Sequence, residues 1–78
     1  MDKANILLEV QDIMRDVLDE PAIELTEATT ADDVEEWDSL THIQLIVAIE
    51  KKFKIKFTSK EILAWKNVGE MVESIMQK

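Results

Sequence analysis

Apolar residues recur at steps of three and four along the first part of the chain. The positions are Ile6, Val10, Ile13, Met14 and Val17. Because this spacing places them on one face of a helix, the sequence predicts an amphipathic helix over residues 3–18, with its apolar stripe in the core. Asp19, Glu20 and Pro21 are expected to stop this helix, since proline lacks an N–H donor and restricts the residue before it.

Residues 21–37 lack a helical period and are rich in Glu, Asp and Thr. Their larger apolar residues are Ile23, Leu25, Val34 and Trp37. We expect a long loop that these side chains anchor, and loops of this length usually have a function. No repeat or low-complexity linker divides the chain, so residues 1–78 are predicted to form a single domain.

A second helix is predicted over residues 39–53. Its apolar residues are Leu40, Ile43, Leu45, Ile46, Val47, Ala48 and Ile49. They occupy more than one stripe, which predicts contacts on two sides and a central position in the fold.

Two shorter helices follow. Thr58 and Glu61 have the spacing of a capping box that opens a short third helix, and Asn67 and Glu70 have the same spacing before a fourth. Residues 53–57 alternate between apolar and polar but have no partner strand, which favours an extended linker. The core positions of the fourth helix are Val68, Met71, Val72 and Ile75. The predicted fold class is all-α, a small four-helix bundle of three main helices plus a short third helix.

Composition narrows the functional classes. The chain has 78 residues, 46% of them hydrophobic, with one Gly and one Pro, which favours one small helical module. The absence of cysteine excludes disulfides and thiolate metal sites. No signal peptide or membrane-spanning segment is evident, so a cytoplasmic location is expected.

The net charge of −8 is unevenly distributed. Residues 1–38 contain two basic and thirteen acidic residues, and residues 39–78 contain seven basic and four acidic residues. Binding to nucleic acid is not expected, because it requires clustered Lys and Arg. The acidic half indicates either a basic partner surface or a solvated face.

Asp38 and Ser39 stand at the predicted start of the second helix. A carboxylate at Asp38 can cap this helix, and the same helix end favours a phosphate on Ser39. No Gly-x-Ser-x-Gly elbow is present and His42 is the only histidine, so no catalytic residue is assigned. We interpret Ser39 as a residue that is modified.

Asp38-Ser39-Leu40, the helix that follows to Phe53, and the continuation from Ile55 to Ile62 together resemble the acyl carrier protein family. The resemblance covers nearly the whole chain. It implies that Ser39, flanked by Asp38 and Leu40, carries 4′-phosphopantetheine donated by coenzyme A through a phosphopantetheinyl transferase. It also implies loading by a ligase or acyltransferase, delivery of the acyl thioester to synthase enzymes, and a monomeric state.

The chain also departs from the family pattern. Glu36 and Trp37 stand where many members have Gly, and the second helix lacks the acidic residues that fatty-acid enzymes recognise. We therefore expect a specialised lipid, polyketide or surface-polysaccharide pathway over housekeeping fatty-acid synthesis. The residues assigned to partner recognition are Thr41, His42, Gln44, Lys51 and Lys52.

The family's acyl pocket lies between the second helix and the third and fourth helices. The residues assigned to it here are Leu45, Ile49, Ile62, Trp65 and Val68. An inward-facing Trp65 would fill much of this space, so we expect short or polar cargo; an outward-facing Trp65 would leave the pocket open.

Several alternatives remain. The chain could be an aminoacyl or peptidyl carrier served by an adenylating ligase, or a helical adapter whose Ser39 is never modified.

The acidic residues 32–38 lack the glycine of a calcium loop, so no metal site is assigned. A Ser39–His42 dyad lacks an orienting group, and His42 is expected to be exposed beside the arm. The spacing of Met14, Met71 and Met76 matches that of the core positions in their helices, so we expect these side chains to pack in the core.

Overall fold

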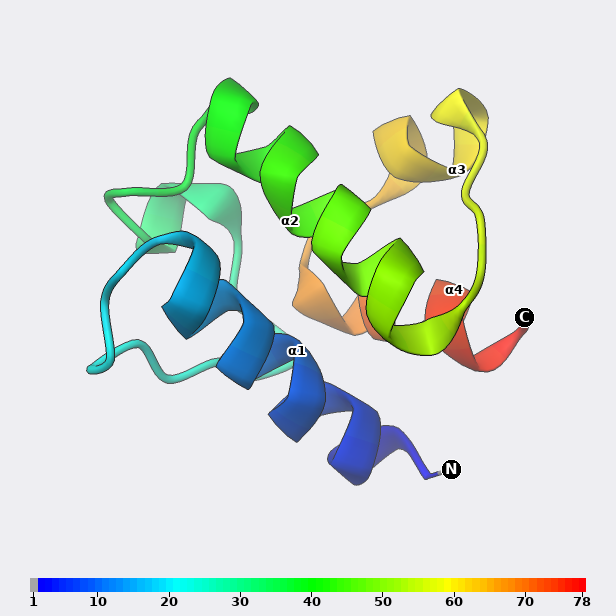
Figure 1. Cartoon of the computed structure of the whole chain (residues 1–78), viewed down its shortest axis with the longest axis horizontal. Coiled ribbons are helices and arrows are strands. Elements are labelled where there is room, and N and C mark those ends of the chain that lie inside the picture. Colours follow the sequence, from blue (N-terminus) through cyan, green and yellow to red (C-terminus); the bar gives the residue numbers. More distant parts are fainter. Residues whose placement is uncertain (1) are drawn as a thin grey trace.

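The computed structural model describes residues 2–78, which form four α-helices joined by loops (Figure 1). The helices are α1 (Lys3–Val17), α2 (Ser39–Phe53), α3 (Ser59–Ala64) and α4 (Val68–Met76). The described residues contain no strand. Of the linker predicted over residues 53–57, Phe53 belongs to α2 and Lys54 has left-handed backbone, whereas residues 55–57 lie outside any helix. The all-α fold with a short third helix is confirmed. One turn of 3₁₀ helix, η1 (Ala31–Asp33), lies inside the loop and was not predicted.

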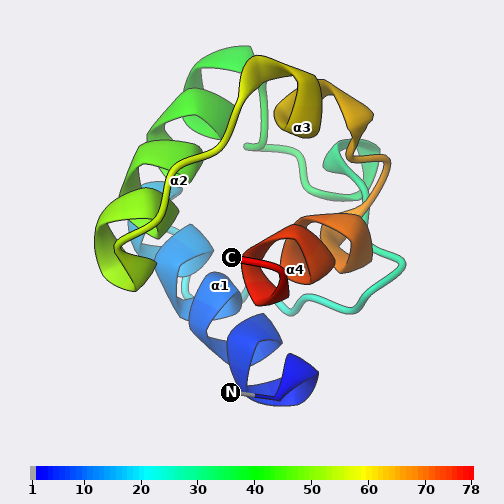
Figure 2. The same cartoon turned by 90° about the vertical axis from the view of Figure 1, so that its right-hand side faces the viewer.

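Helix α1 packs against both α2 and α4 (Figures 1 and 2). The central position in the fold, which was predicted for α2, therefore belongs to α1. The expectation that α2 makes contacts on two sides is wrong. Its buried residues are Leu45, Ile46 and Ile49, whereas Leu40, Ile43 and Val47 are 65%, 60% and 42% exposed. The two sets lie on different faces of the helix, and only the first faces α1 and the core.

The hydrophobic core draws on three of the helices and on the long loop. The four predicted loop anchors are buried, which confirms their role. The core residues are Ile6, Val10, Met14, Ile23, Leu25, Val34, Trp37, Leu45, Ile49, Val68, Met71, Val72 and Ile75. Met76 was predicted to be buried but is 46% exposed. Val68, Val72 and Ile75 form the middle of the α4 face that packs on the core, and Met76 lies at the edge of that face.

Both long helices end on a residue with left-handed backbone. Asp19 has φ 53° and Lys54 has φ 59°, and in each case the next residue donates its N–H to a carbonyl five residues back. This is the Schellman arrangement. The turn at Asp19, within the predicted stop at residues 19–21, therefore ends helix α1 before Pro21 is reached.

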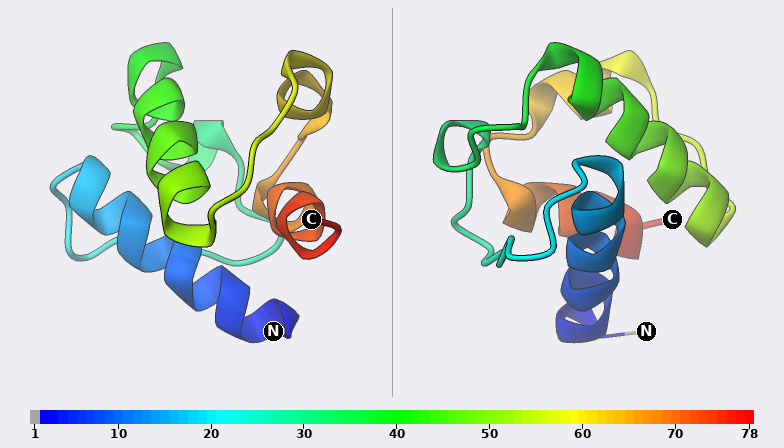
Figure 3. Two further views of the ribbon diagram at one scale, coloured as in Figure 1. Left: turned by 45° about the vertical axis from the view of Figure 1, so that its right-hand side comes forward. Right: turned by 60° about the vertical axis from the view of Figure 1, so that its left-hand side comes forward.

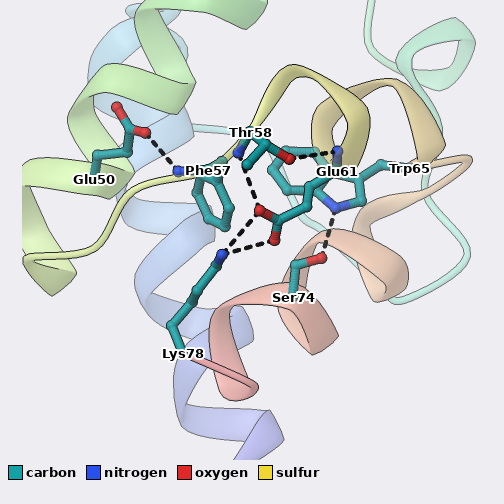
Figure 4. A network of polar contacts seen from close by, with 7 residues as sticks. All are labelled: Glu50, Phe57, Thr58, Glu61, Trp65, Ser74 and Lys78. Carbon is teal, nitrogen blue, oxygen red and sulfur yellow. Dashed lines mark hydrogen bonds and ion pairs between the residues drawn. The ribbon is translucent and has the colours of Figure 1, made fainter.

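The α3 segment, which buries no residue fully, is held to the rest of the fold by a small network (Figure 4). The indole Nε1 of Trp65 donates to Ser74 Oγ of α4 over 2.8 Å, and the Trp65 ring meets Phe57 edge-on at 4.9 Å. Lys78 Nζ lies 2.8 Å from the Glu61 carboxylate. The capping box of Thr58 and Glu61 is present as predicted.

The long loop crosses the start of α4 and bonds to it (Figure 3). The N–H groups of Val68 and Gly69 donate to the carbonyls of Thr29 and Glu27, each over 2.8 Å. Thr29, a buried polar residue, in turn accepts from the Thr26 N–H through its hydroxyl over 2.9 Å. Sequence reasoning did not identify this contact between the loop and α4.

Gly69→Ala should destabilise the fold. A Cβ at this position would lie 2.9 Å from the Glu27 carbonyl oxygen, so the loop would have to move. Overpacking costs about 1–3 kcal/mol, which outweighs the gain of up to about 1 kcal/mol from the better helix propensity of alanine. Urea unfolding should give a free energy of unfolding lower by about 1 kcal/mol. An increase would show that the loop yields without cost.

Candidate functional site

Ser39 is the first residue of α2 and its side chain is exposed. The helix begins here because Asp38, in extended backbone conformation, caps it: Asp38 Oδ1 accepts from the Thr41 N–H over 2.9 Å. In return, Thr41 Oγ1 accepts from the Asp38 N–H over 2.8 Å. This reciprocal capping box fixes the backbone on both sides of Ser39 and confirms the predicted cap.

The capping contacts also set the charge beside Ser39. The Thr41 N–H, followed by further hydrogen bonds, lowers the pKa of Asp38 below its usual range, so this carboxylate stays ionised. The Thr41 hydroxyl, which was assigned to partner recognition, lies within 3.0–3.2 Å of the Glu36 and Asp38 carbonyl oxygens. Its structural role in the cap is therefore clear, and its role toward partners stays a prediction.

Asp38→Asn should weaken the fold in a pH-dependent way. A carboxyl whose pKa is depressed by folding stabilises the fold above its unfolded pKa of about 4 and loses that contribution as the pH falls through the folded value. The melting temperature of the wild type should therefore exceed that of Asp38→Asn at pH 7, and the difference should shrink as the pH falls below the unfolded pKa of about 4. A gap that stays constant with pH would show that the charge of Asp38 is not involved.

His42 is half-buried and bonded, and not exposed as expected. Trp37 Nε1 donates to His42 Nδ1 over 3.0 Å, and Trp65 meets the imidazole edge-on at 6.4 Å. Burial lowers the pKa of His42. The hydrogen bond to Trp37 occupies His42 Nδ1, so this nitrogen is not free to accept a proton from Ser39 in a Ser39–His42 dyad.

A pocket of about 390 Å³ opens beside Ser39, between η1, the start of α2 and the connection from α3 to α4. It is lined by Ala31, Trp37, Asp38, Ser39, His42, Trp65, Lys66, Asn67 and Met71. Of the five residues assigned to an acyl pocket, it contains only Trp65. Leu45, Ile49 and Val68 lie fully buried in the core and Ile62 is half-buried, so the structure does not gather the assigned set around this pocket.

The outer face of α2 carries the other assigned residues. Gln44, Lys51 and Lys52 are exposed, and beside them runs the exposed apolar row of Leu40, Ile43 and Val47, which sequence reasoning had assigned to buried contacts. The i, i+3, i+7 spacing of this row could have marked a separate stripe.

A second pocket of about 410 Å³ lies at the end of α2, lined by Val47, Glu50, Lys51, Lys54, Ile55 and Lys56. Glu50 accepts the Phe57 N–H over 2.9 Å, whereas no carboxylate of the described residues lies within 4.0 Å of the three lysine amines. The α2 face therefore ends in unpaired positive charge.

Within residues 2–78 no three His, Asp or Glu side chains are grouped to hold a metal ion. Over the same residues, no helix has both the length and the apolar character required to cross a membrane.

Comparison with known proteins adds independent information. A family model described as the phosphopantetheine attachment site matches residues 9–75. Among solved structures, the chain is similar to the holo acyl carrier protein of Geobacter metallireducens, determined by NMR in solution. The sequence identity is 41% and the TM-score is 0.89, with 94% of this chain and 84% of that chain covered. A search of curated proteins gave no match.

Proposed function

The chain belongs to the acyl carrier protein family of phosphopantetheine-binding domains, and on this premise we propose that Ser39 bears the arm and that the chain serves a specialised pathway. As a member of this family it is a carrier and not itself an enzyme. Its cofactor is covalently bound 4′-phosphopantetheine. When bound, this group supplies a terminal thiol that holds acyl cargo as a thioester.

The proposed attachment at Ser39 rests on one observation: its exposed hydroxyl lies at the start of a capped 15-residue helix. A phosphate on this hydroxyl would lie at the positive end of the α2 dipole, near N–H groups that have no partner inside the helix. Lys66, which lines the adjoining pocket, has no carboxylate of the described residues within 4.0 Å. The residues present therefore fit a phosphodiester.

The direct test is incubation of the unmodified chain with coenzyme A and a phosphopantetheinyl transferase, followed by intact mass measurement. We expect the mass of one 4′-phosphopantetheinyl group per chain. Because the sequence has no cysteine, thiol titration should rise from zero to one equivalent. No mass gain with a transferase that modifies another carrier would favour the unmodified adapter.

We propose short or polar acyl cargo. The Trp65 ring packs against the core, and its N–H is fixed by Ser74, so the indole stands between α3 and α4 (Figure 4). Long chains would have to displace it. The assignment of Leu45, Ile49, Ile62, Trp65 and Val68 to an acyl pocket stays a prediction.

An aminoacyl or peptidyl carrier would share the arm and the fold and would differ only in cargo. Incubation of the holo chain with candidate adenylating ligases, ATP and amino or fatty acids would separate these two carrier types, since the thioester formed identifies the cargo by mass. The single-domain organisation over residues 1–78, the cytoplasmic location and the monomeric state also stay predictions.

We propose that partner enzymes dock on the outer face of α2. Its apolar row of Leu40, Ile43 and Val47 begins next to Ser39, so a partner on this face would meet the base of the arm. The face ends at Lys51, and this positive charge suits a partner with acidic residues at that edge. Partners in the family generally include the transferase and the synthase or acyltransferase enzymes.

Reversing the charge of Lys51 and Lys52 to Glu should slow association with the native partner and improve recognition by a fatty-acid ketosynthase. Both effects should weaken as salt rises, because exposed charges are screened. Association rates measured at low and high salt provide the check. Lys60→Glu, at an exposed position on α3, is the control. Unchanged rates for both enzymes at low salt would exclude α2 charge as the determinant.

A further inference from the structure

The pocket beside Ser39 is rich in hydrogen-bond donors. His42 Nδ1 accepts from Trp37, so in the neutral imidazole the proton is on Nε2, which has no partner among the described side chains. Asn67 uses its Oδ1 to accept the Glu70 N–H, which leaves its amide N–H groups available. Lys66 adds an ammonium group.

Two acceptor oxygens that line the same pocket are already bonded within the fold. Asp38 Oδ1 accepts from the Thr41 N–H in the α2 cap, and Asn67 Oδ1 accepts from the Glu70 N–H. Between the donors, Trp37, Trp65 and Met71 supply an apolar surface. The pocket therefore suits a compact ligand with a branched apolar body and several oxygen acceptors. Its volume of about 390 Å³ falls at the small end of the range for ligand sites, about 300–1,000 Å³.

The half of 4′-phosphopantetheine nearest the phosphate has this chemistry. It consists of a phosphodiester and a pantoyl unit with two methyl groups, a hydroxyl and an amide carbonyl. Since Ser39 itself lines the pocket, the covalent bond would hold this half at the pocket mouth. Tethering raises the effective concentration into the millimolar range, so even weak contacts would be populated.

We propose that this pocket is a resting site for the pantoyl half of the arm, with Trp37 and Trp65 against its methyl groups and His42 and Lys66 toward its oxygens. The proposal rests on the proposed attachment at Ser39. It makes His42, Trp65 and Lys66 positioning residues for the arm, with the thiol end and its cargo outside the pocket.

NMR of the unmodified and holo chains tests this, with the arm first verified by mass on the same sample. The indole N–H signals of Trp37 and Trp65 should shift between the two forms. The pantoyl methyl protons should show nuclear Overhauser contacts to both indole rings. Lys66→Ala should reduce the indole shifts by at least half, whereas Lys60→Ala, on an exposed lysine outside the pocket lining, should leave them unchanged.

The outcomes separate this proposal from the attachment itself. A sample that gains no arm mass would overturn the assignment of Ser39 and this proposal with it. A holo sample without methyl contacts to the indoles would overturn the resting site and leave the attachment intact. Indole shifts that appear only after an octanoyl group is loaded would show that the pocket takes cargo, and would also overturn the resting site.

Discussion

Ser39→Ala should abolish modification completely and leave the fold intact. The exposed hydroxyl makes no hydrogen bond among the described side chains, and the α2 cap uses Asp38 and Thr41, so its removal leaves no buried polar group unpaired. After incubation with coenzyme A and a transferase, the variant should keep its unmodified mass. Its circular dichroism spectrum and melting temperature should match those of the wild type.

Ser59→Ala is the matched control, because Ser59 is also the first residue of a capped helix, α3. This variant should accept the arm as fully as the wild type. Peptide mapping of modified wild type should place the whole of the added mass on the peptide that contains Ser39. An arm found on Ser59 or Ser74 would refute the assignment.

Trp65→Ala should change both stability and cargo. Loss of the ring removes its packing against Phe57 and its hydrogen bond to Ser74 (Figure 4). Because the indole is only half-buried, the free energy of unfolding should fall by about 2–3 kcal/mol, below the 3–5 kcal/mol of fully buried Trp→Ala changes. The space opened between α3 and α4 should then accept a chain that the wild type leaves in solvent.

Octanoyl and acetyl forms of wild type and variant give the measurement. NMR shifts at Ile49 and Ile62 should follow octanoyl loading only in Trp65→Ala, and acetyl loading should move neither residue. Trp65→Phe, which keeps a ring but loses the N–H donor, supplies a more stable second variant with intermediate shifts. Deep octanoyl shifts in the wild type would show that the indole does not close the space.

Local signals along the chain predicted the helix starts and the exposed serine at the start of α2. Asp38 precedes an apolar run, and Thr58 and Asn67 precede Glu at the capping distance, so each helix start depends on contacts within three residues. The ends of the helices were harder to predict from the sequence than their starts. Asp19 and Lys54 adopt a left-handed backbone although glycine is the usual residue there, so composition did not reveal either turn.

The candidate site was predictable only in part, because local sequence signals do not reveal contacts between distant segments. The place of Ser39 on α2 follows from neighbours in the chain. The pocket beside it combines Trp37, His42 and Trp65 from separate segments, and Trp65 is 28 positions beyond Trp37. The sequence analysis assigned Trp65 to an acyl pocket and His42 to solvent, whereas in the structure the two rings meet edge-on and both are half-buried.

Four helices, the anchored loop and a serine at a helix start follow from sequence signals alone, because helical period and capping act over a few residues. The tertiary structure sets which apolar stripe of α2 is buried. Two stripes of similar hydrophobicity are equivalent along the chain, and the choice is made where α1 covers Leu45 and Ile49 and leaves Leu40 and Ile43 exposed. It also decided where the pocket lies, because that depends on contacts between residues far apart in the chain.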